Sequence, residues 1–147
     1  MTQLLNEQVA QQIQEVFQDL KEPVEMLFFG SNQNCQYCDE TRQLAEEVAA
    51  ISDKINLNVY DLDENSNIAQ AYNVDSAPYI IMAAMNGDVI QDLGVHFRGI
   101  PSGHEFTSFI QAILIVSSRD SGLSEQARTF IKALDKPINL QVFVTPT

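Results

Sequence analysis

The sequence predicts an α/β fold in which a mixed central sheet is flanked by helices. Three observations carry this prediction. The apolar run Val24–Phe29 leads through a polar loop into an amphipathic helix that opens with Cys35-Gln36-Tyr37-Cys38. A second alternation of strand and helix follows, with apolar residues at period two in the strand and Ser66 as the cap of a short helix. Pro78 then heads another apolar strand, and Asn86-Gly87 is a strong signal for a hairpin that returns the chain antiparallel.

Each element follows from its own pattern. Apolar residues three or four apart predict helices over 7–20, from the cysteines to about 51 and from about 105, and Ser66 as a cap predicts a short helix over 67–72. Apolar runs or period two predict strands over 24–29, 55–62, from 79 and from 88, the last bent at Gly94. A helix over 124–134 and a strand over 138–144 complete the chain. On the cysteine helix, the expected apolar stripe consists of Tyr37, Thr41, Leu44, Val48 and Ile51. Ser102 and Glu105 have the spacing of a capping box.

Length and composition restrict the class of protein. The chain has 147 residues, of which 45% are hydrophobic, and a net charge of -12. That length suits one domain, and the charge argues against a nucleic-acid surface. No apolar stretch is long enough to span a membrane, and the first residues lack a signal-peptide pattern. We therefore expect a cytoplasmic protein, a setting in which paired cysteines are more often catalytic or metal-binding than structural.

The two cysteines are the first candidate for chemistry. A helix start brings residues three apart close enough for a disulfide, and its dipole and free N–H groups favour a thiolate. The alternatives are half of a zinc site or two unrelated buried cysteines. His96 and His104 do not lie at short ligand spacing from each other or from the cysteines. We assign neither histidine a role, expect no metal, and favour a redox pair.

Local sequence alone leaves the interpretation of two further features open. Asp61, Asp63 and Glu64 follow the second strand, and because their spacing matches no calcium loop we interpret them as a solvated strand end. Pro78 lies at the entrance of an apolar strand. It is either an ordinary edge-strand proline or, with a cis bond to Ala77, a fixed and exposed kink.

The end of the chain repeats an earlier pattern. Leu20-Lys21-Glu22-Pro23 before the first strand is echoed by Leu134-Asp135-Lys136-Pro137 before residues 138–144. We interpret residues 1–120 as one unit, and 121–147 as the linker helix and first strand of a missing or truncated second unit. Such a strand would add to the edge of the first unit's sheet or pair with a neighbouring chain, which is self-association.

The element order resembles the thioredoxin fold, and Val74-Asp75-Ser76-Ala77-Pro78 looks like its cis-proline segment. More specifically, the cysteine motif, the segment 94–106 (GVHFRGIPSGHEF) and the segment 141–147 (QVFVTPT) are similar to the glutaredoxin-like protein disulfide oxidoreductases. That family carries two thioredoxin-fold units in tandem, each with its own Cys-x-x-Cys. The second motif is absent here, and no acidic residue lies in 26–29 to take a proton from Cys38.

The resemblance implies a protein disulfide oxidoreductase. Cys35 would attack a substrate disulfide, Cys38 would resolve the mixed disulfide, and Ala77 would pair through its backbone with a substrate strand bordered by Pro78. No bound cofactor is needed. The implied partners are protein or small-thiol disulfides and a partner reductase or thiol pool. The alternatives are a binding or structural unit whose main active site lies in an absent second unit, and a metal shared through the cysteines of two chains.

Overall fold

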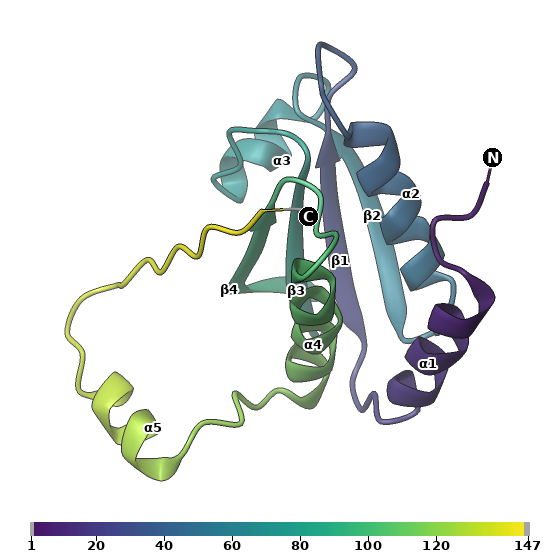
Figure 1. The fold of residues 1–147 in the computed structure, drawn as a ribbon. Helices are drawn as coiled ribbons and strands as arrows, with labels where there is room; N and C mark the ends of the chain where they lie inside the picture. Colours follow the sequence, from purple (N-terminus) through teal and green to yellow (C-terminus); the bar gives the residue numbers. More distant parts are fainter. Residues whose placement is uncertain (1, 146–147) are drawn as a thin grey trace.

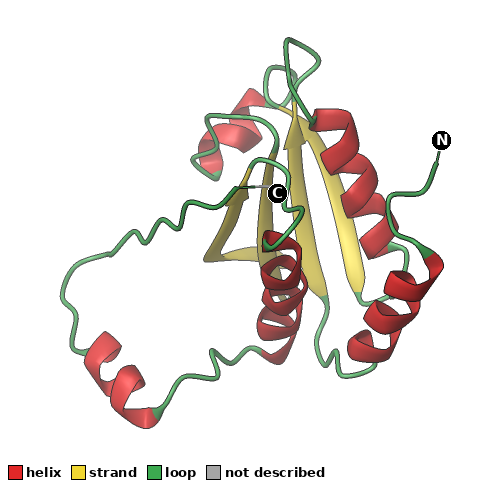
Figure 2. Ribbon diagram, in the orientation of Figure 1, coloured by secondary structure: helices red, strands yellow, loops and turns green. Residues whose placement is uncertain are grey.

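Four strands form one mixed sheet in the order β2-β1-β3-β4 in the computed structural model, which describes residues 2–145 (Figures 1 and 2). β1 pairs in parallel with β2 and antiparallel with β3, and β3 pairs antiparallel with β4. This is the thioredoxin-like α/β fold that the sequence predicts. In chain order the elements are α1 Glu7–Phe17, β1 Val24–Gly30, α2 Cys38–Ala49, β2 Ile55–Asp61, α3 Ser66–Ala71, β3 Tyr79–Asn86, β4 Val89–Arg98, α4 Glu105–Ser118 and α5 Glu125–Lys132.

The central strand β1 is buried along its whole length, which explains why its sequence is a continuous apolar run rather than an alternation. Its side chains point alternately to the two faces of the sheet. Met26 and Phe28 join a core cluster with residues of α1, α2 and α4, whereas Leu27 and Phe29 join a smaller cluster with residues of α3. Burying each of these large side chains contributes about 1.5–3 kcal/mol. The central position of β1 therefore fixes the strand end from which the cysteine loop departs.

The hairpin between β3 and β4 confirms the turn and the bend expected from the sequence. Asn86 pairs with Val89 across a two-residue turn. Further along, Met82 pairs with Val95 but Ala83 pairs with Asp92, so that β4 carries an irregularity at this point. Gly94 lies in it with φ 83°, a backbone conformation that favours glycine.

Several helix ends differ from expectation. The first helix ends at Phe17 and not at Leu20, because the next residues make only i to i−3 bonds. Ser102 does not cap α4: its carbonyl accepts from the N–H of Glu105 in a tight turn, and the capping position belongs to His104, which makes no side-chain cap bond. None of the helices within residues 2–145 is long and apolar enough to cross a membrane.

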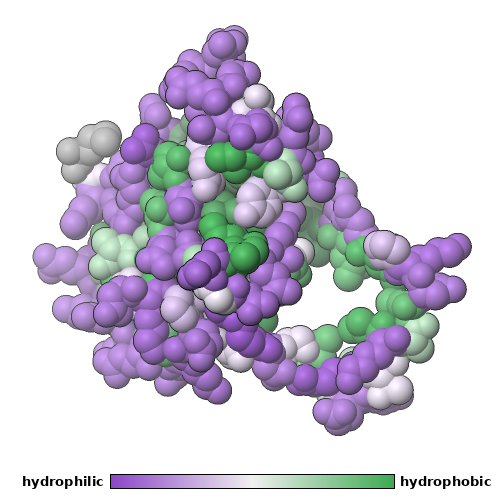
Figure 3. All heavy atoms as spheres, turned by 180° about the vertical axis from the view of Figure 1, so that it is seen from behind, coloured by the Kyte–Doolittle hydropathy of each residue, from purple (hydrophilic) through white to green (hydrophobic). Residues whose placement is uncertain are grey.

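The C-terminal segment differs most from the sequence prediction. α5 forms as expected, with the Ser124 side chain accepting from the N–H of Ala127, but none of its residues is buried. The strand expected over 138–144 does not form, and it adds to neither edge of the sheet. The reason is that no neighbouring strand lies beside it, so its backbone has no ladder to join. Figure 3 shows this tail standing away from the body, and its apolar side chains are exposed: Ile138, Leu140, Val142, Phe143 and Val144.

Candidate redox site

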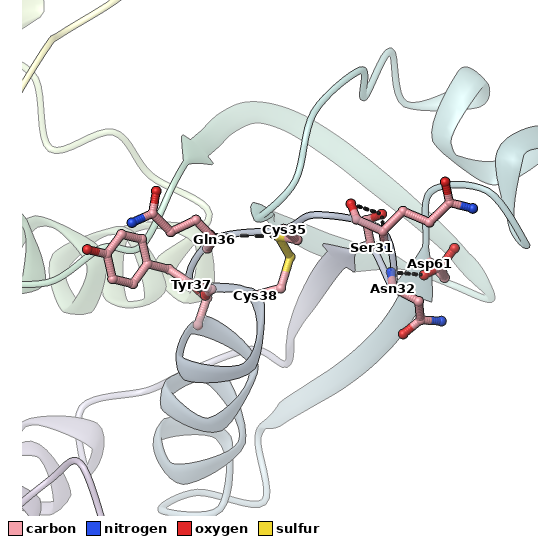
Figure 4. The surroundings of a disulfide bond; sticks show 9 residues. Ser31, Asn32, Cys35, Gln36, Tyr37, Cys38 and Asp61 are labelled. Atoms are coloured by element: carbon pink, nitrogen blue, oxygen red, sulfur yellow. Dashed lines mark hydrogen bonds between the residues drawn. A yellow bond between two sulfur atoms is a disulfide. The ribbon is translucent and has the colours of Figure 1, made fainter.

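Cys35 and Cys38 form a disulfide at the end of α2 that faces the β1–α2 loop, with their Cα atoms 5.6 Å apart (Figure 4). The helix begins only at Cys38, so Cys35 precedes it rather than opening it as expected. Between them, Tyr37 occupies the N-cap position in the left-handed conformation, with φ 67°. Its side chain is exposed, so the prediction that Tyr37 belongs to the apolar stripe of this helix is wrong. The Tyr37 carbonyl accepts hydrogen bonds from both the N–H and the hydroxyl of Thr41, at 2.9 and 2.6 Å.

The two sulfur-bearing residues differ in exposure. Cys35 is partly exposed, whereas Cys38 is buried at 7% exposure. Cys35 lies before the positive end of the helix dipole, which favours its thiolate once the disulfide is reduced. Asp39 and Glu40 in the first turn of α2 oppose that effect. The geometry therefore makes Cys35 the accessible sulfur and Cys38 the inner one.

Gly30 at the end of β1 leaves room for the Phe28 ring close to the inner sulfur. A Cβ atom at Gly30 would lie 3.0 Å from Phe28 Cε1 and 3.8 Å from Cys38 Sγ, so a larger residue would press on the ring and only touch the sulfur. A cavity of about 230 Å³ opens beside this point, between the end of the β1–β2 pair and α2. Its lining includes Cys38 together with the charged residues Asp39, Arg42, Asp61 and Glu64. Cys38 thus faces a polar cavity.

Pro78 has the cis bond to Ala77 that the resemblance to the thioredoxin fold implies, but its ring is buried and not exposed as expected for such a kink. β3 begins directly afterwards at Tyr79, which pairs with Phe29 near the end of β1, so the register brings the cis-proline to the same sheet edge as the cysteines. The Pro78 carbonyl accepts from the N–H of Gly99 at 2.9 Å. Ala77, just outside the strand, is partly exposed.

Asp61 is a site residue that sequence reasoning missed. It ends β2, and its carboxylate accepts a hydrogen bond at 3.0 Å from the N–H of Asn32 in the cysteine loop (Figure 4). It also accepts from the N–H groups of Asp63 and Glu64. Asp61 does end the strand with a partly exposed side chain, as interpreted from the sequence, but its bond to the cysteine loop was not expected. The only signal in the sequence was an acidic residue at the end of a strand parallel to β1.

His96 also has a partner that its sequence position does not reveal. Its Nδ1 lies 2.6 Å from the Tyr79 hydroxyl, and its Nε2 lies 2.8 Å from Asp92 Oδ2. This network lies on the sheet face opposite α2. Tyr79, which takes part in it, is the residue that follows the cis-proline. Among residues 2–145, no group of three or more His, Cys, Asp or Glu side chains is arranged to hold a metal ion.

Fold and site together define a class: a thioredoxin-fold unit with a Cys-x-x-Cys disulfide and a cis-proline at the same sheet edge. The chain resembles tandem thioredoxin-fold proteins in particular. It matches a protein disulfide oxidoreductase from Aeropyrum pernix with TM-score 0.76 and 25% identity, covering 88% of this chain and 55% of that one. It matches the alkylhydroperoxide reductase protein AhpF of Enterococcus faecalis with TM-score 0.79 and 28% identity, covering 91% of this chain and 62% of that one.

Sequence comparison gives the same relationship. The chain is 28% identical to the corresponding alkyl hydroperoxide reductase protein of Staphylococcus epidermidis over 144 residues, 98% of this chain and 25% of that protein. It therefore spans about a quarter of the length of this curated relative. Its likeness to a thioredoxin of Halobacterium salinarum, with TM-score 0.51 and 21% identity, shows the fold alone. No family model matches the chain.

Proposed function

We propose that this chain is a thiol–disulfide oxidoreductase unit that uses Cys35 and Cys38 on protein disulfides. The observation that carries the proposal is the disulfide itself, with one partly exposed and one buried cysteine. A thiolate is the attacking species in disulfide exchange, and the helix start favours it at the accessible position. The likeness to a protein disulfide oxidoreductase of known structure supports this function.

The reaction proceeds in two exchanges. The Cys35 thiolate attacks one sulfur of the substrate disulfide, whose S–S bond breaks and releases a substrate thiolate. Cys38, after losing its proton, then attacks the Cys35 sulfur and releases the second substrate thiolate. Two electrons pass to the substrate, each released thiolate takes up a proton, and the Cys35–Cys38 disulfide forms. A partner reductase or thiol pool restores the dithiol, without a bound cofactor.

Ala77 and Pro78 are the proposed substrate-binding residues. No hydrogen bond involves the backbone N–H or carbonyl of Ala77 within the described residues. These free groups suit an extended substrate segment that adds beside the 75–77 segment as a short strand. Pro78, which has no N–H, would border the attacked sulfur. This pairing requires no particular substrate side chain, so it favours protein disulfides of varied sequence.

The experiment compares two single-cysteine proteins, Cys38→Ser and Cys35→Ser, in iodoacetamide labelling near neutral pH. We expect Cys35, retained in Cys38→Ser, to react faster because it is the more accessible residue and lies at the helix start. In the presence of a disulfide-bonded test protein, Cys38→Ser should accumulate a mixed disulfide, and Cys35→Ser should not. Faster labelling of Cys38 would reverse the assigned roles.

A second candidate function is favoured by the small part of its relatives' length that this chain covers. It matches a quarter of the alkyl hydroperoxide reductase protein of Staphylococcus epidermidis, so the main active site of the whole protein could lie elsewhere. In that case residues 1–120 would be a binding or structural unit, and 121–147 the opening of a second unit. The exposed tail and the absence of buried residues in α5 are consistent with that division. Catalysis of protein disulfide reduction by this chain alone, lost in Cys35→Ser, separates the two candidates.

A further inference from the structure

One carboxylate bridges two chain segments at the redox site. Oδ2 of Asp61 accepts from the N–H of Asn32 at 3.0 Å, three residues before Cys35. Oδ1 accepts from the N–H groups of Asp63 and Glu64, at 2.9 and 3.2 Å. The side chain thus links the cysteine loop to the turn after β2, across 29 residues of sequence.

The cysteine loop has few other anchors. Its remaining hydrogen bonds within residues 31–36 are local: the Gln33 N–H donates to Ser31 Oγ at 3.1 Å, and that hydroxyl donates to the Gln33 carbonyl. Cys35 Sγ lies 3.7 Å from the neighbouring Gln36 carbonyl. In the described part of the chain, the bond to Asp61 is the one hydrogen bond from residues 31–36 to a distant segment. When the disulfide opens, this bond still ties the loop to the end of β2.

The backbone N–H groups around Asp61 favour the ionised form of its carboxylate. The N–H groups of Glu64 and Asp63 hold the pKa of Asp61 below its usual 3.8; desolvation opposes this effect, and the N–H of Asn32 lowers the pKa by the smallest amount. The ionised form, which only accepts hydrogen bonds, is therefore the form present near neutral pH. Since the turn after β2 fixes this side chain on one side, it can hold the loop on the other.

We propose that Asp61 is a positioning residue that keeps Cys35 within reach of Cys38 in the dithiol state and thereby stabilises the Cys35–Cys38 disulfide. The proposal rests on the dithiol function proposed above. Forming the disulfide closes a short loop, and a loop already held in place loses less conformational freedom on closure. A loop freed from Asp61 loses more, so the equilibrium with a thiol pool shifts toward the dithiol.

The test measures the equilibrium between the Cys35–Cys38 pair and glutathione. In this equilibrium the protein dithiol and oxidised glutathione convert into the protein disulfide and two molecules of reduced glutathione. Asp61→Asn retains one carbonyl oxygen, which can accept from Asn32 or from the turn but no longer serves both. We expect a fall of about tenfold in the equilibrium constant for forming the protein disulfide, a rise of about 30 mV in reduction potential.

Asp63→Asn is the matched control, because it removes the same charge two residues away and its side chain makes no hydrogen bond to the loop. It should change the constant by less than about twofold, since an exposed charge is well screened. Asp61→Glu keeps the charge but displaces the carboxylate by one methylene, so it should resemble Asp61→Asn. It also decides the question if Asp61→Asn fails to fold, as judged by circular dichroism.

The outcomes separate this proposal from the one on which it rests. If the wild-type pair does not exchange with glutathione at all, the dithiol function fails and this inference fails with it. If the wild-type pair exchanges and folded Asp61→Asn and Asp61→Glu keep its equilibrium constant, only the positioning role is overturned. An equal shift in Asp63→Asn and Asp61→Asn would mean that charge, and not the bond to Asn32, sets the potential.

Discussion

Replacing His96 by alanine removes the hydrogen-bond partner of a buried hydroxyl. Tyr79 is only 4% exposed, and burial raises the pKa of Tyr79, so its phenol stays protonated. The tyrosine hydroxyl is hydrogen-bonded to Nδ1 of His96, and the Nε2–H of His96 donates to the Asp92 carboxylate, which can only accept. His96→Ala leaves the tyrosine hydroxyl without this partner.

The expected loss follows from that burial. A buried polar group left unpartnered costs about 1–3 kcal/mol, and loss of the edge-on ring contact between Tyr79 and His96 adds a smaller amount. Asp92 contributes little, because its side chain is 27% exposed and still accepts from the N–H of Gly94. We therefore expect unfolding to become easier by about 2 kcal/mol, with a fall in Tm of about 4–8 °C for a chain of this size.

Urea unfolding followed by circular dichroism measures this change. His104→Ala is the matched control, because His104 is exposed, makes no side-chain cap bond, and should shift stability by less than about 0.5 kcal/mol. In a Tyr79→Phe background, which lacks the hydroxyl, His96→Ala should cost distinctly less. Equal effects of the two histidine substitutions, or an undiminished cost in the Tyr79→Phe background, would refute the reasoning.

Two further predictions concern acid stability and the tail. Because the folded-state pKa of Asp61 is lowered, its contribution is fully present above the usual 3.8 and is lost as the pH falls through the folded value. The free energy of unfolding should therefore decline below about pH 4, and less steeply in Asp61→Asn, as measured by urea titration at several pH values. Deleting residues 121–147 should lower stability by less than about 1 kcal/mol, because α5 buries none of its residues; loss of folding would defeat the two-unit interpretation.

Much of the framework was predictable because it depends on contacts near in sequence. The Asn86-Gly87 turn fixes the hairpin, and Gly94 supplies the positive φ at the irregularity in β4. The cysteine pair lies three residues apart, so its disulfide needs no tertiary information. The cis bond before Pro78 followed from the resemblance and not from local sequence, which left both isomers open.

The partners of Asp61 and His96 were not predictable in this way. Asp61 meets Asn32 only because β1 and β2 pair in parallel and end at the same edge, with Gly30 opposite Asp61. His96 meets Tyr79 diagonally across the β3–β4 ladder, in which His96 pairs with Ile81 and Tyr79 pairs with Arg98. In both cases a polar side chain with no motif of its own acquires its role from the sheet topology.

The C-terminal tail also shows that sheet topology decides the outcome, because here a strand-like sequence lacks neighbouring strands. Residues 24–29 and 138–144 follow the same leucine, charged-pair and proline sequence, and both are apolar enough to be strands. The first forms β1, because β2 and β3 supply ladder partners on both sides. The second remains unpaired, with Leu140 and Phe143 about as exposed as side chains become, at 88% and 89%. A strand needs neighbouring strands to pair with, so residues 138–144 are expected to pair wherever another sheet offers a free edge.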